Sequence, residues 1–296
     1  MRKHNSKLAF SLIELSVVIL IIGILVIGIS KSSRIIMASR LKSAQTLTSG
    51  SVVNSMDGLI MWLEPSLASS FDKGVVGGSA IQNWYDNNQG ASKNNASQST
   101  QGYRPSYQEN VANGVPSVKF DTTDDFLTIP NFELRNARNG GFAVFMVLQK
   151  TQGGRGDPIN YKNAAANDDF GIIMETDNKV THYIRINGVQ YAQAAGSNVL
   201  ANKFNVLTLT RNNLLNYVAY VNGASDFSAG LAIDFSNIDM GTPLYIGANH
   251  DDAFTGVYYS FGGYISEVIV FNRALKTQER KDVEQYLGKK YNVKVS

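Results

Sequence analysis

An apolar run close to the N-terminus, from Val17 to Ile29, constrains this chain more than any other feature of its sequence. A helix that crosses a hydrocarbon layer of about 30 Å needs about 20 mostly apolar residues, and this run with the residues just before it is about that long. Three basic side chains, Arg2, Lys3 and Lys7, precede the run. Because positive residues stay on the cytoplasmic side of a membrane, they predict a short cytoplasmic tail.

A single acidic residue interrupts the start of the apolar stretch. Glu14 places a carboxylate where an unpaired charge is costly, so it calls for a partner. An ordinary secretory signal has an apolar region of about 7–15 residues followed directly by a cleavage site. Neither such a signal nor a plain signal anchor explains Glu14.

The residues around Glu14 resemble the N-terminus of type IV prepilins, which have a basic leader, a small residue and a Phe-Ser-Leu-Ile-Glu sequence before an apolar helix. The resemblance covers residues 1–50 and implies a leader peptide at residues 1–9. It also implies that a prepilin peptidase cuts between Ala9 and Phe10 and methylates the new terminus. The family usually has Gly where this chain has Ala9. In that family the carboxylate equivalent to Glu14 pairs with the N-terminal ammonium of a neighbouring subunit.

The same resemblance predicts how the N-terminal segment is organised. A pilin-type helix is expected over residues 10–50, with a transmembrane half at residues 10–29 and a linker at residues 51–56. Gly50 is expected to end the helix in the left-handed conformation, which glycine adopts easily. Residues at helical spacing predict an apolar stripe that packs on the head: Ile35, Ile36, Leu41, Ala44 and Leu47.

Charge and cysteine content exclude several classes of protein. The formal net charge is +3, and the leader carries three positive charges, so the mature chain is near zero (3 − 3 = 0). That balance gives no indication of nucleic-acid binding. The chain has no cysteine, which rules out a disulfide framework and thiolate metal or redox sites.

From residue 57 onward the sequence changes to short alternating segments separated by turn residues. Residues 142–148 are almost all apolar and predict a central strand that is covered on both faces. Asn222-Gly223 follows another strand and is a strong hairpin signal. Residues 87–101 are rich in Asn, Ser, Gln and Gly and predict a long surface loop. Many short strands with regular turns indicate a β-sandwich over residues 57–296.

Four segments, 57–63, 217–223, 244–249 and 263–275, resemble laminin-G-like, concanavalin A-like jelly rolls. The resemblance implies a short C-terminal helix, which residues 278–290 fit. Thr277 is a candidate cap for that helix. The residues expected to face the sandwich are Val283, Tyr286, Leu287 and Lys290. The predicted fold is therefore a long N-terminal α-helix followed by an all-β jelly-roll sandwich with a short C-terminal helix.

The head shows no pattern of catalytic residues. Jelly-roll glycosidases carry Glu-x-Asp-x-x-Glu on one strand, because retaining hydrolysis needs two close carboxylates, and the sequence lacks that spacing. Glu267 stands alone and is expected to pair with a neighbour in a structural role. His182 is expected to be an ordinary strand residue rather than a ligand. The sequence therefore indicates no enzyme and no cofactor, with calcium as the one ion to consider.

Acidic loop residues are the candidates for calcium binding, because calcium takes six to eight oxygen ligands. They are Asp124, Asp125, Asn249, Asp251 and Asp252. The alternative is that these loops are only acidic and solvated.

An aromatic loop is the candidate site for a carbohydrate or another surface ligand. Tyr258, Tyr259 and Phe261 lie between two glycines, and the alternative is that they pack the end of a strand. Arg155-Gly156-Asp157 matches the integrin tripeptide, but such a short motif also occurs by chance at a glycine-rich turn.

These observations predict a pilin-like filament subunit whose lectin-like head serves adhesion. Its precursor would lie in a bacterial inner membrane, and the mature form in a cell-surface filament or a periplasmic pseudopilus. Its partners would be other pilin subunits, the prepilin peptidase and a carbohydrate or surface ligand. Two alternatives remain open: a pseudopilin of type II secretion, and an adhesin for which the filament serves only as a support.

Overall fold

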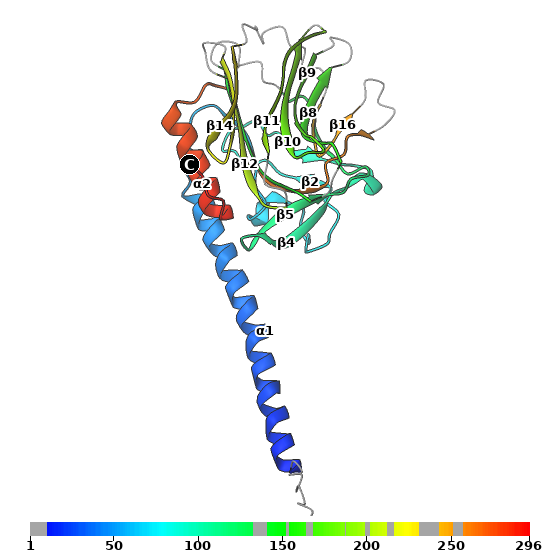
Figure 1. Ribbon diagram of the computed structural model, residues 1–296, viewed down its shortest axis with the longest axis vertical. Helices are drawn as coiled ribbons and strands as arrows, with labels where there is room; N and C mark the ends of the chain where they lie inside the picture. Colours follow the sequence, from blue (N-terminus) through cyan, green and yellow to red (C-terminus); the bar gives the residue numbers. More distant parts are fainter. Residues whose placement is uncertain are drawn as a thin grey trace, which may run out of the picture.

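The structure is a computed structural model that describes residues 11–132, 141–151, 154–163, 168–186, 188–198, 202–211, 216–230, 243–250 and 257–296. It contains an N-terminal helix, α1 (Leu12–Ser49), a two-sheet head and a C-terminal helix, α2 (Thr277–Tyr291). In Figure 1, α1 projects from the head as a single rod, and only its C-terminal end contacts the head. The predicted cleavage residues Ala9 and Phe10 lie outside the described residues.

Helix α1 begins with a capping box. The Ser11 hydroxyl accepts a hydrogen bond from the N–H of Ile13, and Glu14 accepts one from the N–H of Ser11. These bonds satisfy N–H groups that have no partner within the helix. Gly50 ends the helix with φ of −94°, so the predicted left-handed exit is wrong. The Gly50 N–H still bonds to the carbonyl of Thr46, which closes the last turn without a positive φ.

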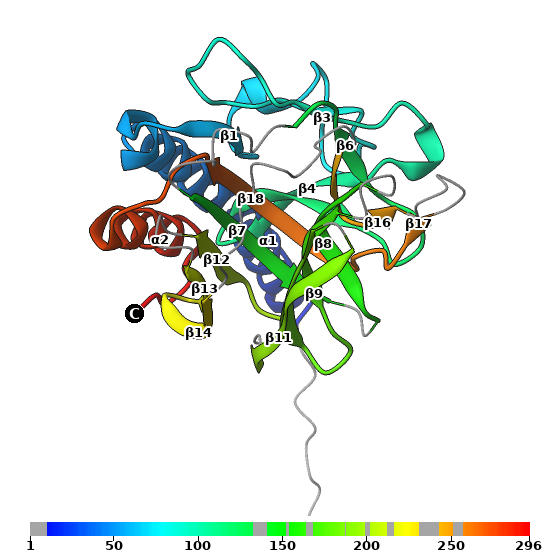
Figure 2. The ribbon, with the colours of Figure 1, turned by 90° about the horizontal axis from the view of Figure 1, so that it is seen from above.

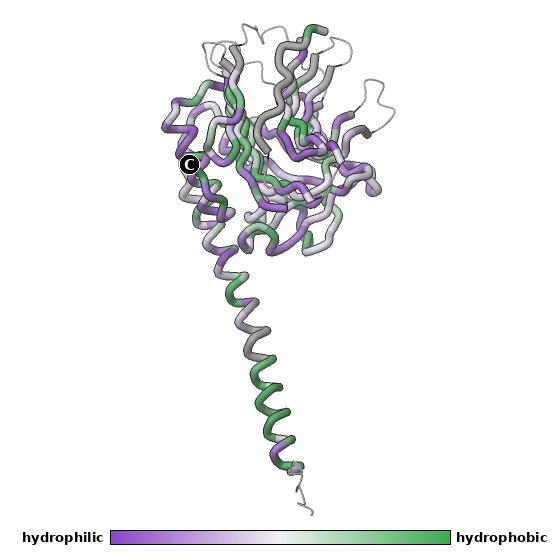
Figure 3. The backbone as a smooth tube through the Cα atoms, in the orientation of Figure 1, coloured by the Kyte–Doolittle hydropathy of each residue, from purple (hydrophilic) through white to green (hydrophobic). Residues whose placement is uncertain are grey.

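The part of α1 that is far from the head is apolar and exposed. Figure 3 shows hydrophobic residues gathered on this half of the helix. Leu12, Ile19 and Leu25 have exposed fractions of 86%, 61% and 58%. Among the described residues, no helix has both the length and the apolarity of a membrane span.

The predicted linker at residues 51–56 is itself structured. It forms a 3-10 turn, η1 (Val52–Ser55), that buries Val53 against the head. Two more 3-10 turns lie within the head, η2 (Ala68–Ser70) and η3 (Gln101–Tyr103). The chain therefore passes from α1 into the sandwich through a packed connection.

The first sheet, sheet A, is antiparallel and has the order β14-β13-β12-β7-β18-β5-β4, with β1 pairing to the second half of β18. Its strands are β1 (Leu59–Leu63), β4 (Ser106–Ala112), β5 (Val115–Phe120), β7 (Phe142–Lys150), β12 (Asn205–Arg211), β13 (Asn216–Val221), β14 (Ala224–Gly230) and β18 (Gly263–Phe271). The predicted central strand is confirmed, because β7 lies between β12 and β18 and is buried from Phe142 to Leu148. The predicted hairpin is confirmed too: Asn222 and Gly223 have φ of 51° and 81° between β13 and β14.

The second sheet, sheet B, has the order β11-β10-β9-β8-β15-β6-β3-β2. Its strands are β2 (Asn83–Trp84), β3 (Ala96–Ser97), β6 (Leu127–Ile129), β8 (Gly156–Asn163), β9 (Asp168–Met174), β10 (Lys179–Ile186), β11 (Val189–Asn198) and β15 (Leu244–Ile246). A separate two-stranded ribbon joins β16 (Asn249–His250) to β17 (Val257–Tyr258). The long surface loop predicted at residues 87–101 is only partly correct, since this segment contains β3 and buries Asn88.

Sheet A is covered on both faces. One face packs against sheet B through a core that includes Met146, Ile172 and Val268, and the other packs against α2 and the end of α1 through Phe145 and Ile269. Figure 2 shows the two helices on one side of β7, β12 and β18, with β8 and β9 on the other. Sheet A therefore needs apolar residues on both faces, which explains its unbroken apolar runs.

The face of α2 toward the sheet is the predicted one, since Val283, Tyr286, Leu287 and Lys290 are all buried. The N-cap, however, is Lys276 and not Thr277, which is the first helical residue. Glu279 accepts a hydrogen bond from the N–H of Lys276 at 2.7 Å. The start of α2 is therefore capped by this carboxylate and not by the hydroxyl of Thr277.

Candidate functional site

Three loops meet at one end of the sandwich and bring several of the predicted ligand residues together. The Phe261 N–H donates to the carbonyl of Gly247 at 2.7 Å, and the Asp157 N–H donates to the carbonyl of Tyr259 at 2.8 Å. These bonds join segments 155–158, 247–249 and 259–261, which we call the end loops. The sequence suggested residues from each segment, but their proximity comes only from the fold.

Within the end loops, the aromatic residues have different surroundings. Tyr259 is 48% exposed and has φ of 51°, an uncommon conformation for a bulky residue. The guanidinium of Arg155 lies 3.9 Å from the centre of its ring. Phe261 is fully buried in the core between the sheets, so its prediction as a ligand residue is wrong, and strand-end packing explains it. The side chain of Tyr258 lies outside the described residues.

The Arg-Gly-Asp tripeptide is part of this packing rather than an exposed motif. Asp157 has an exposed fraction of 0% and accepts a hydrogen bond from the Asn249 amide at 2.9 Å. A Cβ on Gly156 would lie 2.7 Å from the Cα of Phe261, so only glycine fits there without a shift of the backbone. The tripeptide therefore shapes the end loops and does not present its carboxylate to a partner.

A group of three carboxylates follows strand β5. Ligand atoms of Asp121, Asp124 and Asp125, which we call the acidic loop, lie within 4.8 Å of one another. Asp121 was missed from the sequence, although an Asp at a strand end that accepts backbone N–H groups is a recognisable turn signal. Its Oδ1 accepts from the N–H of Asp124 at 3.0 Å. The Ser260 hydroxyl donates to the carbonyl of Thr123 at 2.9 Å, which ties this loop to the end loops.

Burial and mutual repulsion raise the pKa of carboxyls in the acidic loop. The pKa of Asp125 is raised to about 6, mainly by burial and further by the charges of Asp121 and Asp124. Burial and the charge of Asp121 also raise the pKa of Asp124. Of the other predicted calcium ligands, Asn249 bonds to Asp157, and Asp251 and Asp252 lie outside the described residues. The acidic loop has the oxygen ligands that a hard cation prefers, and the end loops would have to supply more of them.

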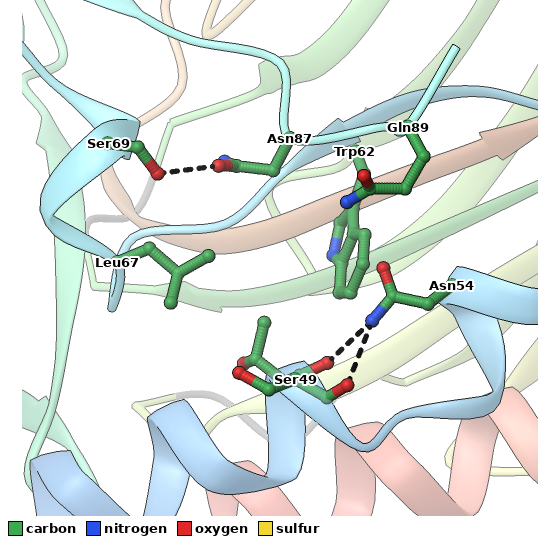
Figure 4. A pocket seen from close by; sticks show the side chains of 8 residues that line it. Ser49, Asn54, Trp62, Leu67, Ser69, Asn87 and Gln89 are labelled. Atoms are coloured by element: carbon green, nitrogen blue, oxygen red, sulfur yellow. Dashed lines mark hydrogen bonds between the residues drawn. The ribbon is translucent and has the colours of Figure 1, made fainter.

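A cavity of about 440 Å³ lies where α1 joins the head, and we call it the neck cavity. Its lining residues are uncharged: Thr48, Ser49, Asn54, Trp62, Leu67, Ser69, Asn87 and Gln89. In Figure 4, Leu67 and Ser69 face Asn54 and Gln89 across the opening. This cavity could not be predicted from the sequence, because its walls come from α1, η1, β1 and the loops after β1 and β2.

Directly behind the neck cavity lies a fully buried group of charges, Glu64, Glu267 and Lys290, which we call the ion network. The Lys290 ammonium lies 2.5 Å from Glu64 Oε2 and 2.8 Å from Glu267 Oε2. Burial alone would lower the pKa of Lys290, but the two carboxylates raise it above its usual value. Glu267 was expected to pair with a neighbour, and its partner is this lysine, which is contributed by α2.

Further hydrogen bonds connect the ion network to the neck cavity and to both helices, including one from the Thr48 hydroxyl of α1 to Glu64 at 3.4 Å. Glu267 accepts from the Trp62 indole N–H at 2.7 Å and from the hydroxyls of Tyr286 and Tyr291 at 2.8 and 2.7 Å. Glu64 accepts from the N–H of Leu67 at 2.7 Å. Such a complete set of donors is what two buried carboxylates require, since an unsatisfied buried charge is costly.

Glu14, the last predicted site residue, is far from all of these groups, at the exposed start of α1. Its described contact is the capping bond from the Ser11 N–H at 2.9 Å. The predicted pairing of Glu14 with another subunit stays a prediction.

Comparisons with known proteins found solved structures and a family to which parts of this chain are similar. Among solved structures, a mutant of HCR D/C VPI 5995 has a TM-score of 0.53 at 16% identity, over 79% of this chain and 53% of that chain. A mutant of the NanB sialidase from Streptococcus pneumoniae has a TM-score of 0.47 at 21% identity, over 55% of this chain and 26% of the sialidase. The Ruminococcus gnavus IT-sialidase CBM40 bound to alpha2,3 sialyllactose has a TM-score of 0.44 at 17% identity, over 50% of this chain and 84% of that chain.

The chain thus spans about a quarter of the length of the NanB sialidase structures that it matches. None of the curated proteins compared with it matches. Residues 121–279, more than half of the chain, match the family described as the Concanavalin A-like lectin/glucanases superfamily. Together with the two antiparallel sheets, this match shows that the chain belongs to the concanavalin A-like lectin/glucanases superfamily.

Proposed function

We propose that this protein is a type IV pilin-like filament subunit that displays a lectin-like, non-catalytic head. The observation that carries the proposal is the form of α1, which continues away from the head as one helix and exposes its apolar residues. An exposed apolar surface of this extent is costly in water and indicates a lipid or protein partner. A bundle of identical helices is one such environment.

The N-terminal sequence supplies the details of this proposal. The apolar half of the N-terminal helix, residues 10–29, would hold the precursor in a bacterial inner membrane until a prepilin peptidase removes the leader, residues 1–9, by cutting before Phe10. Glu14 lies in the first turn of α1, within reach of the new terminus through Ser11. After cleavage, its carboxylate would pair with the ammonium of a neighbouring subunit, and a subunit out of register would leave that charge unpaired.

The proposed role of the head is to bind a carbohydrate or another surface ligand. Membership of a superfamily that includes lectins supports a binding role, and the exposed ring of Tyr259 beside Arg155 gives the end loops one stacking surface. The acidic loop next to the end loops is the proposed calcium site. A bound calcium ion would neutralise its crowded carboxylates and so hold the neighbouring loops in place.

Replacement of Glu14 by valine tests the assembly proposal. The variant is expected to be inserted and processed like the native chain but to form no filaments, because the terminal ammonium then has no carboxylate to pair with. Electron microscopy of cells measures the number of filaments. Ser16→Ala is the control, because Ser16 is also exposed and lies two positions after Glu14 in α1. Normal filaments from Glu14→Val would show that the pairing idea is wrong.

Sequencing the exported protein tests the processing step independently. N-methylated Phe10 as the first residue is the expected result. A chain that still begins at Met1, or a head released without α1, would overturn the filament proposal. Filaments that stay in the periplasm instead of the cell surface would identify a secretion pseudopilin.

A further inference from the structure

We propose that the neck cavity is a binding site for a neutral saccharide. The inference deepens the lectin-like function proposed above, and it assigns the ligand to a place remote from the Tyr259 loop. The cavity volume of about 440 Å³ falls within the range of about 300–1,000 Å³ that is typical of ligand sites.

The chemistry of the walls matches a ligand with many hydroxyl groups. The amide of Gln89 offers both a donor and an acceptor. The amide oxygens of Asn54 and Asn87 and the hydroxyl oxygens of Ser49 and Ser69 add acceptors, since their own donors bond within the protein. Leu67 and Trp62 contribute an apolar part of the wall. A sugar ring has the same combination of alternating hydroxyl groups and apolar C–H faces.

The polar groups of the walls are held in place before any ligand arrives. The Asn87 amide donates to the carbonyl of Tyr85 and to the hydroxyl of Ser70, both at 3.1 Å, and accepts from Ser69 at 3.1 Å. The Asn54 amide donates to the carbonyl of Thr48 at 3.1 Å, which fixes the wall next to α1. Preorganised groups lose little entropy on binding, so such a site retains more of its interaction energy.

The charge behind the cavity selects against acidic ligands. The ion network holds two carboxylates and one ammonium, a formal charge of −1, and it bonds directly to Trp62 and Leu67 of the cavity wall. The lining residues themselves carry no positive group that could pair with a carboxylate. Since a buried negative charge repels an anion through a low dielectric, a sialylated or uronic sugar should bind poorly. A cationic ligand would find no carboxylate in the lining to pair with.

The position of the cavity gives the bound sugar contacts on both parts of the molecule. Thr48 and Ser49 belong to α1, Asn54 to the connecting turn η1, and Trp62 to β1 of the head. A ligand there would be held at the junction of filament helix and head, rather than at the end loops.

Binding is tested with the full chain in detergent micelles, by calorimetric titration with maltose, cellobiose, lactose and 3′-sialyllactose. At least one neutral disaccharide is expected to bind, and 3′-sialyllactose to bind at least about tenfold more weakly. The chain has two tryptophans, so the indole N–H signal of Trp62 in an NMR spectrum is a second readout. It is expected to shift with the neutral sugar.

Three variants locate the site. Ser69→Trp fills the cavity from an exposed position and Gln89→Ala removes one amide, and both are expected to weaken binding about tenfold or more. Ser99→Trp is the matched control, because it places the same bulk on an exposed serine outside the cavity. Tyr259→Ala is expected to have no effect on the neutral sugar.

The outcomes separate this inference from the proposed function. Loss of binding in Tyr259→Ala alone, with Ser69→Trp unaffected, would overturn the neck site and leave a lectin that binds through its end loops. Preferred binding of 3′-sialyllactose would overturn the charge argument and with it the ligand class. No binding of any neutral sugar would overturn the inference, whereas filament assembly through Glu14 is measured separately.

Discussion

Two groups of acidic residues in this protein show how burial changes what a carboxylate requires. In the ion network, Glu64 and Glu267 are fully buried and share the ammonium of Lys290. In the acidic loop, Asp121, Asp124 and Asp125 are partly buried and, among the described residues, form no ion pair. The first group is neutralised as far as its geometry allows, and the second stays crowded with like charge. The difference indicates that the ion network holds the fold together, while the acidic loop can respond to an added cation.

The largest effect is expected from removal of the buried ammonium. Lys290→Met should lower the free energy of unfolding by about 3–5 kcal/mol, because two buried carboxylates lose their counter-charge. Urea unfolding of the full chain in micelles measures the loss. Lys289→Met is the matched control, because Lys289 is the exposed neighbour of Lys290 on α2. This substitution should change the free energy of unfolding by no more than about 0.5 kcal/mol. Equal effects from the two variants would mean that the ion network adds nothing to the fold.

A third ionisable group, His182, is buried between the sheets with neither ring nitrogen bonded to any described residue. Burial lowers its pKa to about 4, although the charge of Asp226 acts in the opposite direction. Below the usual histidine pKa of about 6.5, His182 binds a proton in the unfolded chain but stays neutral in the folded chain. Stability should therefore fall by about 3 kcal/mol as the pH drops from about 6.5 to about 4.

His182→Phe tests this effect by removing the titrating group while keeping an aromatic ring beside Tyr217. The variant should lose less stability than the native chain between pH 7 and pH 4.5, as measured by urea unfolding at each pH. If both chains lose the same amount of stability in this range, His182 is not the source of the acid sensitivity.

The smallest effect is expected in the acidic loop, and its pH dependence has the opposite sign. Because the pKa of Asp125 is raised to about 6, the folded chain binds the proton more tightly, and stability should fall as the pH rises from about 4 to about 6. Asp125→Asn should remove that cost and stabilise the protein at pH 7 by roughly 1 kcal/mol or less, since solvent screens the loop.

Calcium provides the control for this last comparison. If the acidic loop binds the ion, 10 mM calcium should raise the melting temperature of the native chain and have less effect on Asp125→Asn. Equal changes in the melting temperatures of the two chains would show that calcium does not bind at the acidic loop.

Local sequence patterns predicted the parts of the fold that depend on neighbouring residues. The apolar run that became β7, the Asn222-Gly223 turn and the buried face of α2 all follow from short-range periodicity and turn chemistry. The same reasoning placed Asp124 and Asp125 in a loop. It failed at Phe261, which has the composition of an exposed aromatic loop but fills the core.

Contacts between distant residues decided the rest. Lys290 meets Glu64 across 226 positions of the sequence, and Trp62 meets Glu267 across 205. Neither partner carries a local signal for the other, because a buried charge pair depends on which elements the packed sheets bring together. The neck cavity arises in the same way, from five elements that only the folded chain places side by side. The apolar helix and the class of sandwich could be predicted from the sequence, because periodicity and turn residues act locally. Which polar groups are buried together, and where a ligand could enter, depends on contacts that form only in the folded chain.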